Sequence, residues 1–79
     1  MNNVGYRFLQ SGKLMEAIEV FKLNVISYPE SGNVYDSLGE AYLEAGKKEL
    51  AIKNYKKSIE IDPENVNGVK ILEKLQSNN

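Results

Sequence analysis

Apolar residues in the second half of the chain recur at steps of three and four, the spacing of one face of an α-helix. Leu38, Tyr42 and Ala45 follow this spacing, and the stretch after residue 50 repeats it. Glycine and proline interrupt the pattern at regular places, so each apolar stretch has the length of one helix. The pattern predicts helices at about residues 2–11, 14–27, 33–45, 48–61 and 66–76.

The expected helix ends carry residues suited to ending or starting a helix. Gly12 and Gly46 stand where a helix needs a C-terminal residue in the left-handed conformation, which glycine adopts without a steric penalty. A proline follows each second helix, which cannot continue through it. Asn33 and Asn65 are the expected N-caps, because asparagine side chains accept hydrogen bonds from the free N–H groups of a first turn.

The chain repeats itself at a fixed distance. Residues 4–29 align without a gap with residues 38–63, a shift of 34 positions because 39 − 5 = 34. Eight of the 26 aligned pairs are identical: Gly5/Gly39, Leu9/Leu43, Gly12/Gly46, Lys13/Lys47, Ala17/Ala51, Ile18/Ile52, Lys22/Lys56 and Pro29/Pro63. Self-similarity of this kind indicates a repeat architecture built from helix pairs.

Composition limits the classes of partner. The chain has 79 residues, which is one small domain, with ten Lys and Arg against eleven Asp and Glu. The resulting net charge of −1 cannot neutralise a row of phosphates, so we expect no nucleic-acid partner. No stretch approaches the roughly 20 apolar residues that cross a bilayer, and no export signal is readable at the start. We expect a soluble chain without a membrane partner; these features favour the cytoplasm and leave the compartment open.

The residue types also limit the chemistry. The sequence has no Cys and no His, which excludes a Ser-His-Asp triad, a Cys-His pair and the common zinc sites. Asp36, Glu40 and Glu44 lie in a row at helical spacing, but no second element is expected to converge on them as a metal or acid/base site needs. Lys57 and Ser58 are neighbours whose side chains diverge on a helix. We therefore expect no catalytic residues, no cofactor and no metal.

The repeat resembles the tetratricopeptide repeat, whose unit has 34 residues and forms two antiparallel helices. The second unit, residues 32–65, matches the family at its aromatic, Leu-Gly, turn, small and proline places: Tyr35 (where the family usually has Trp), Leu38, Gly39, Tyr42, Gly46, Ala51, Tyr55 and Pro63. Ser58 stands where the family usually has Ala.

The first unit, residues 1–31, follows the same pattern less completely. It matches at Gly5, Phe8, Gly12, Ala17, Phe21 and Pro29. The opening residues of its pattern are absent, and Asn24 replaces the second small residue. The resemblance implies one domain, an all-α solenoid of two helix-turn-helix units with a capping helix at residues 66–76. Gly5 and Gly39 are expected to let the second helix of each unit approach at backbone distance, with aromatic rings beside the crossing.

The resemblance also implies a protein-interaction module without catalytic activity. First helices of this family line a concave groove, where an extended or helical peptide would lie. The residues expected to contact it are Tyr6, Leu9, Asn33, Asp36, Ser37, Glu40, Leu43, Glu44, Lys70 and Lys74. Tyr6 takes the place of Glu40, and its ring serves either as a partner anchor or as ordinary packing at the helix end.

The family's carboxylate clamp is not expected in this chain. That clamp uses Lys, Arg and Asn to grip the terminal carboxylate of a peptide. The matching places carry Asn2, Asn3, Tyr6, Asp36 and Glu40, a neutral to acidic set. An acidic C-terminal peptide should therefore not bind.

Two further origins remain open. The stretch FKLNVISYPESGNVYDSLGEAY is similar to the repeat tail found at the C-terminal end of some bacterial serine hydrolases of the esterase and β-lactamase-like kind. That similarity implies an accessory or docking domain of a larger bacterial hydrolase. A designed or excised model repeat protein is the other possibility.

The two units differ on the outside of their second helices. Met15, Val20, Leu23 and Ile26 correspond to Glu49, Asn54, Lys57 and Glu60. The apolar set lies opposite the core side of its helix, apart from Val20 on the flank. A second apolar stripe predicts a face covered by a preceding domain, a missing repeat or a second copy of the chain. The alternative is a set of scattered surface residues, which are common.

Overall fold

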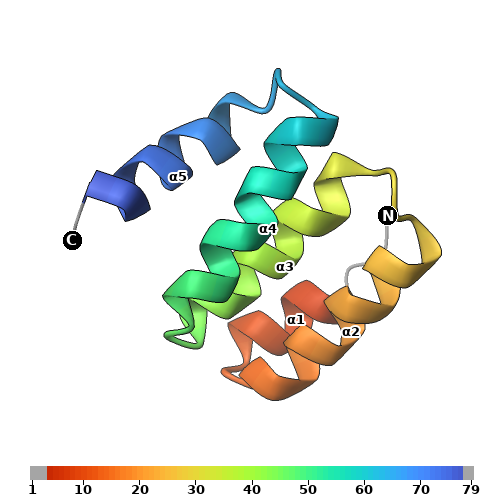
Figure 1. Ribbon diagram of the computed structural model, residues 1–79. Helices are drawn as coiled ribbons and strands as arrows, with labels where there is room; N and C mark the ends of the chain where they lie inside the picture. Colours follow the sequence, from red (N-terminus) through yellow and green to blue (C-terminus); the bar gives the residue numbers. More distant parts are fainter. Residues whose placement is uncertain (1–3, 78–79) are drawn as a thin grey trace.

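Residues 4–77 are described by a computed structural model and form five helices and no strand (Figure 1). In chain order these are α1 (Val4–Gln10), α2 (Leu14–Ser27), α3 (Gly32–Glu44), α4 (Lys48–Ile61) and α5 (Val66–Ser77). The all-α class is confirmed, and each described helix lies within a residue or two of its expected range. Each helix packs against the next one in the chain, so the helices form a continuous stack.

The two turns inside the helix pairs have the same geometry. Gly12 and Gly46 have φ angles of +76° and +77°, as their places in the sequence predict. The N–H of Lys13 donates to the carbonyl of Phe8 at 2.8 Å, and the N–H of Lys47 donates to the carbonyl of Tyr42 at 2.8 Å. These bonds use carbonyls that the helix leaves free at its C-terminus, so each glycine makes a compact turn into the next helix.

One of the two expected N-caps is confirmed and the other is wrong. The Asn65 side chain accepts a hydrogen bond of 3.1 Å from the N–H of Gly68 in the first turn of α5. By contrast α3 begins at Gly32 after Ser31, so Asn33 already lies inside the helix. The hydroxyl of Ser58 on α4 donates to the Gly32 carbonyl at 2.8 Å, so the first residue of α3 is bonded to the second helix of its pair.

The buried core comes from both helix pairs. Its members are Ala17, Ile18, Phe21, Leu38, Ala41, Tyr42, Ala51 and Tyr55. The rings of Phe21 and Tyr55 are each 1% exposed. Burying a side chain of this size stabilises the fold by about 2–3 kcal/mol. Ile71, Leu72 and Leu75 of α5 pack against this core at the C-terminal end.

The glycines of the first helices face aromatic rings. A methyl group added at Gly39 would lie 3.1 Å from the Tyr55 ring, and one added at Gly5 would overlap the Phe21 ring. These rings lie on the glycines themselves, and not beside the helix crossing as expected. Ala17 and Ala51, on the same second helices as the rings, are fully buried in the close-packed core.

Candidate peptide-binding surface

The residues expected to contact a peptide come from three helices. Tyr6 and Leu9 lie on α1, and Lys70 and Lys74 lie on α5, where both lysines are exposed. The other six lie on α3: Asn33, Asp36, Ser37, Glu40, Leu43 and Glu44. Asn33 and Glu44 are exposed and Ser37 is buried. The half-buried members are Tyr6, Leu9, Asp36, Glu40 and Leu43. Their contact with a partner stays a prediction.

Tyr6 joins α1 to both neighbouring helices. Its ring meets the Phe21 ring edge to face, with centroids 5.0 Å apart and an angle of 65° between the planes. Its hydroxyl shares a hydrogen bond of 2.6 Å with the hydroxyl of Ser37 on α3. Of the two roles expected for Tyr6, packing is therefore observed, while a role as partner anchor stays a prediction. Burial raises the pKa of Tyr6, the Ser37 bond lowers it, and the charges of Glu40 and Asp36 raise it further.

Asp36, Glu40 and Glu44, defined here as the acidic row, lie at successive turns of α3. Burial raises the pKa of Glu40, the charge of Asp36 raises it further, a hydrogen bond from Tyr6 lowers it, and the charge of Glu44 raises it. The ion pairs found between residues 4 and 77 do not involve the row; they join Lys22 to Glu19 and Lys57 to Glu60. The row is thus a source of negative potential on this surface.

Asp36 also has a structural role that the sequence did not reveal. Its carboxylate accepts a hydrogen bond of 2.7 Å from the side-chain amide of Asn65. The same amide lies 3.0 Å from the Ser58 hydroxyl, while the Asn65 side-chain oxygen caps α5. A methyl group added at Gly68 would meet the Asn65 amide at 2.6 Å, so α5 approaches this network closely. The network ties α3, α4 and α5 together.

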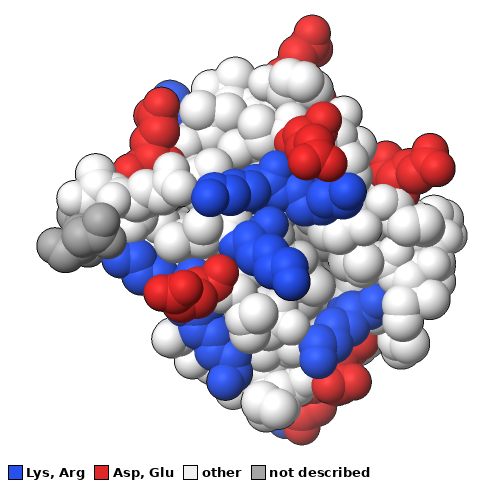
Figure 2. Space-filling view, in the orientation of Figure 1, with Lys and Arg blue, Asp and Glu red and all other residues white. Residues whose placement is uncertain are grey.

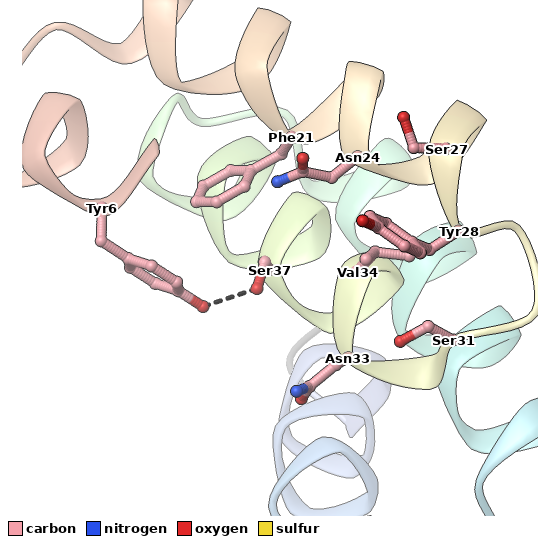
Figure 3. A pocket seen from close by; sticks show the side chains of 9 residues that line it. All are labelled: Tyr6, Phe21, Asn24, Ser27, Tyr28, Ser31, Asn33, Val34 and Ser37. Atoms are coloured by element: carbon pink, nitrogen blue, oxygen red, sulfur yellow. Dashed lines mark hydrogen bonds between the residues drawn. The ribbon is translucent and has the colours of Figure 1, made fainter. Parts of the chain in front are cut away.

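A pocket of about 540 Å³ opens between α1, α2 and α3 (Figure 3). It is called the α1–α3 pocket below. Three of the expected contact residues line it: Tyr6, Asn33 and Ser37. The core residue Phe21 lies behind them. The other lining residues were not expected as contacts: Asn24, Ser27, Tyr28, Ser31 and Val34. The signal for this pocket in the sequence is Asn24, which stands where the repeat pattern has its second small residue.

The described lining of the pocket mixes amides and hydroxyls with aromatic and aliphatic side chains and carries no charged residue. In Figure 3 the Asn24 side chain extends from α2 beside the Phe21 ring, and Tyr6 closes the pocket from α1. Amide and hydroxyl groups of the lining lie next to aromatic rings and the apolar side chain of Val34. Such a surface can hydrogen-bond a peptide backbone and can bury small uncharged side chains.

The expected clamp site is only partly visible. Asn2 and Asn3 lie outside the described residues. The other members are Tyr6 on α1 and Asp36 and Glu40 on α3, which make a neutral to acidic set. No Lys or Arg within residues 4–77 lines the pocket. The absence of binding to an acidic C-terminal peptide stays a prediction.

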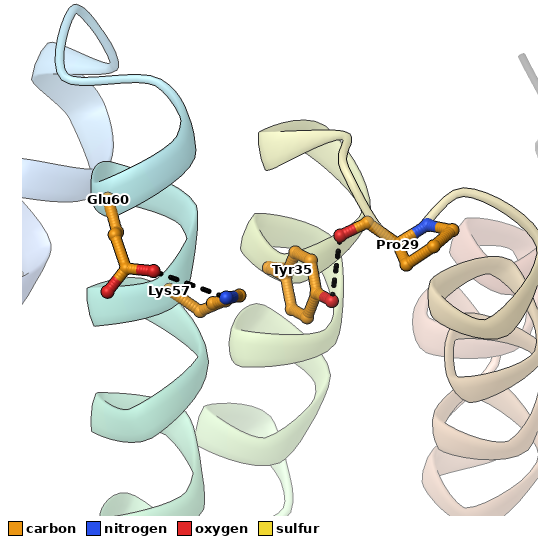
Figure 4. A network of polar contacts seen from close by, with 4 residues as sticks. All are labelled: Pro29, Tyr35, Lys57 and Glu60. Atoms are coloured by element: carbon orange, nitrogen blue, oxygen red, sulfur yellow. Dashed lines mark hydrogen bonds and ion pairs between the residues drawn. The ribbon is translucent and has the colours of Figure 1, made fainter.

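Lys57 and Ser58 are separated by the structure as their helical spacing predicts. Ser58 is fully buried and bonded to Gly32, whereas Lys57 is exposed and pairs with Glu60 at 3.2 Å (Figure 4). On the neighbouring helix, the hydroxyl of Tyr35 donates to the carbonyl of Pro29 at 3.0 Å.

Figure 2 shows basic side chains near the middle of the face seen in Figure 1, with acidic side chains next to them. This surface therefore carries mixed charge.

The outer face of α2 is apolar and exposed. Met15, Leu23 and Ile26 are 64%, 61% and 74% exposed, and Val20 is partly covered. Their exposure agrees with their positions opposite the core side of α2. Whether another polypeptide covers this stripe stays a prediction.

No helix between Val4 and Ser77 combines the length and apolar character that crossing a membrane requires. Within the same residues, no three His, Cys, Asp or Glu side chains gather in a way that could hold a metal ion.

Similarity to known proteins agrees with the helix pairs. A family model described as Tetratricopeptide repeat matches residues 32–65. Superkiller complex protein 3 of Homo sapiens is 32% identical over 65 residues, which are 82% of this chain and 4% of that protein. The chain thus spans a small part of the relative it matches. Together with the five stacked helices and the repeated glycine turns, these matches identify residues 32–65 as a tetratricopeptide repeat.

Proposed function

We propose that this chain binds a peptide segment of another protein along the surface formed by α1, α3 and α5. Tetratricopeptide repeats generally act as protein-interaction modules, and an all-helical repeat of this kind is typically non-catalytic. The observation that supports the proposal is the acidic row, because three carboxylates one turn apart lie outside the ion pairs found among the described residues. A partner with basic side chains at a matching spacing would neutralise them.

The sign of the charge changes along this surface, from acidic on α3 to basic on α5. Lys70 and Lys74 take the places in α5 that Asp36 and Glu40 take in α3, since each lysine lies 34 positions after its acidic counterpart. A peptide lying across the surface would therefore place basic residues over α3 and acidic residues toward α5. Leu9 and Leu43, both half-buried, offer apolar contacts between the charged positions.

A titration with a defined basic peptide tests this proposal. The probe is a blocked dodecapeptide with four lysines spaced to face successive helical turns, added to ¹⁵N-labelled chain while amide spectra are recorded. We expect saturable shifts in the acidic row that weaken between about 20 and 150 mM NaCl, because exposed charges are screened over roughly 10 Å at such salt.

Matched charge removals provide the control. The double variant Glu40→Gln with Glu44→Gln should weaken binding by about 2- to 30-fold, given about 0.2–1 kcal/mol for each of the two charge contacts. Removing the same number of charges from the second helices, with Glu16→Gln and Glu49→Gln, should leave affinity nearly unchanged. Equal losses in the two double variants, or no saturable shift, would contradict the proposal.

A second interaction through the outer face of α2 is favoured by the exposure of Met15, Leu23 and Ile26. We infer that this stripe contacts a second copy of the chain or a further domain. The sequence similarity to hydrolase tails supports the version in which the chain is an accessory domain, and a designed or excised repeat protein remains the alternative origin. None of these versions requires catalysis by the chain itself.

A further inference from the structure

A second hollow lies on the outer face of α4 and shares no described lining residue with the α1–α3 pocket. It has a volume of about 390 Å³ and is called the α4 groove below. Tyr35 of α3 forms one wall, and residues of α4 form the other: Lys53, Asn54, Lys56, Lys57 and Glu60. By the 34-position register, residues 1–3 correspond to residues 35–37, so the matching place beside them is on α2 rather than on α4.

The Tyr35 ring is a fixed wall of this groove. Its hydroxyl donates to the Pro29 carbonyl at 3.0 Å, which ties the ring to the segment between α2 and α3. In Figure 4 the ring stands between Pro29 and α4, and the Lys57 side chain extends from α4 toward it. Lysine side chains carry methylene stems below their charged ends, so the groove combines apolar walls with a charged rim. Such walls can contact an apolar side chain of a partner.

The charge of the groove is positive and only partly balanced. Lys57 pairs with Glu60 at 3.2 Å. The ion pairs found among residues 4–77 include neither Lys53 nor Lys56, which are both exposed, and do not join Glu49 to Lys53 four positions later. Three lysines against one glutamate leave a net charge of +2 on the lining, whereas the whole chain carries −1. The groove is therefore a local source of positive potential.

The matching place on α2 is neutral. A shift of 34 positions leads from Lys53 to Glu19 and from Lys56 to Lys22. Glu19 and Lys22 form an ion pair of 4.0 Å. In α4 a lysine stands where α2 has the acid of this pair, and residues three apart on a helix are neighbours, so the two ammonium groups repel each other. A carboxylate supplied from outside would relieve that repulsion.

We propose that the α4 groove binds an acidic segment of another protein. Two carboxylates of the segment pair with Lys53 and Lys56, and an apolar side chain next to them packs on the Tyr35 ring. The groove is distinct from the acidic row, which lies about 100° or more around α3 from Tyr35 at 3.6 residues per turn. It takes a partner of the opposite charge, so this inference goes beyond the proposed function.

A blocked pentapeptide, Glu-Glu-Phe-Glu-Glu, tests the groove. Added to ¹⁵N-labelled chain, it should cause saturable shifts at the backbone amides of Tyr35, Lys53 and Lys56, with a Kd of about 1 mM in about 20 mM NaCl. Binding should weaken several-fold at about 150 mM NaCl, because exposed charges are then screened over roughly 8 Å. The blocked ends leave no terminal carboxylate, so the peptide does not probe the clamp positions on α3.

Matched pairs of lysines locate the contact. Lys53→Gln with Lys56→Gln should weaken binding about 3- to 10-fold, because two exposed charge contacts are lost. Lys70→Gln with Lys74→Gln removes the same charge from α5 and should change the Kd by less than about 2-fold. In the probe, glutamine in place of glutamate should abolish the saturable shifts, and serine in place of phenylalanine should weaken binding. Circular dichroism of both variant chains checks that they remain folded.

Three results would overturn the groove inference. The first is no saturable shift up to about 5 mM pentapeptide. The second is a loss of binding in the α5 variant as large as that in the α4 variant, which would place acidic peptides on the surface of α1, α3 and α5. The third is tighter binding of a thymidylate octamer at the same amides, which would assign the groove to nucleic acid. The lysine dodecapeptide tests the acidic row separately, so the groove and the proposed function can fail independently.

Discussion

The helix pairs α1–α2 and α3–α4 keep the same interior and differ at their edges. In both pairs an aromatic ring of the second helix lies on a glycine of the first, Phe21 on Gly5 and Tyr55 on Gly39. One turn later the pairs diverge, because Ser58 holds the first turn of α3 whereas its counterpart Asn24 faces a pocket. Residues that agree between the units thus carry stability, and residues that differ mark surfaces available to partners.

The outsides of α2 and α4 differ in the same sense. Met15, Leu23 and Ile26 are exposed apolar residues on α2, while the matching face of α4 carries charge, including the Lys57–Glu60 pair. The shared interior tolerates either surface because these positions point away from it. The comparison therefore predicts large effects at shared positions and small effects, or effects on binding alone, at differing ones.

The largest effect is expected where the two pairs agree. Phe21→Ala and Tyr55→Ala should each cost about 3–5 kcal/mol, since both rings are 1% exposed and their removal leaves a cavity. A loss of that size is comparable to the whole stability of a small domain, so both variants should be largely unfolded at 25 °C. Loss of the helical circular dichroism signal measures this. A variant that keeps cooperative unfolding near the wild-type midpoint would break the equivalence of the two pairs.

A smaller and unequal effect is expected one turn later. Ser58→Ala should cost about 1–3 kcal/mol, because the buried Gly32 carbonyl and the Asn65 amide each lose a partner. The matched change Asn24→Ala should cost less than about 0.5 kcal/mol, because the Asn24 side chain is half-exposed and lies at a pocket. Urea unfolding of the two variants gives the difference. Equal losses would show that Asn24 already holds a buried group.

The sequence predicted the parts of the fold that depend on local spacing. Five helices, the glycine turns at Gly12 and Gly46 and the cap at Asn65 follow from residues a few positions apart. The expected start of α3, with Asn33 as its N-cap, was wrong: α3 begins at Gly32, whose carbonyl accepts a hydrogen bond from Ser58, 26 positions away. The sequence places Asn33 in front of a helical pattern but contains no local sign of that bond.

The candidate surface was less predictable for the same physical reason. The bond between Tyr6 and Ser37 spans 31 positions, and the bond between Asn65 and Asp36 spans 29. Repeat register can list which side chains share a face, but it does not show which of them bond to one another. The pocket depends on the packing of three helices, so only the departure at Asn24 hinted at it.

The cap of α5 offers the next effect in size. Asn65→Ala should cost about 1–2 kcal/mol, because it removes the cap and the link to Asp36 together. The matched place before α3 is Ser31, whose side chain makes no cap bond, so Ser31→Ala should be nearly neutral. Hydrogen exchange should show faster exchange in α5 for the Asn65 variant. Exchange in α5 that matches the wild type would contradict the role of the network.

The stripe on α2 should affect association rather than folding. If it contacts a second copy, the chain should self-associate at high concentration, and Leu23→Lys with Ile26→Glu should abolish association while helicity is retained. Both side chains are more than half exposed, so the cost in stability should be within about 0.5 kcal/mol. Sedimentation of the two proteins measures this. A wild-type monomer at about millimolar concentration, with the stripe's methyl groups accessible to a soluble relaxation probe, would retire the self-association version.

The smallest expected effect concerns Glu40, which takes the place of Tyr6 in the other unit. Burial and the neighbouring charges of Asp36 and Glu44 raise its pKa in the folded chain, outweighing the hydrogen bond from Tyr6. The folded state then binds the proton more tightly than the unfolded state, so this group makes stability fall as the pH rises through the raised pKa. Replacing it by glutamine removes that penalty. The midpoint temperature of Glu40→Gln should exceed that of the wild type slightly at pH 7, and the two should converge at a pH below the ordinary pKa of glutamate. The exposed Glu49→Gln variant is the control, and a Glu40→Gln midpoint at or below the wild type at pH 7 would show that the carboxylate is stabilised by a partner in the fold.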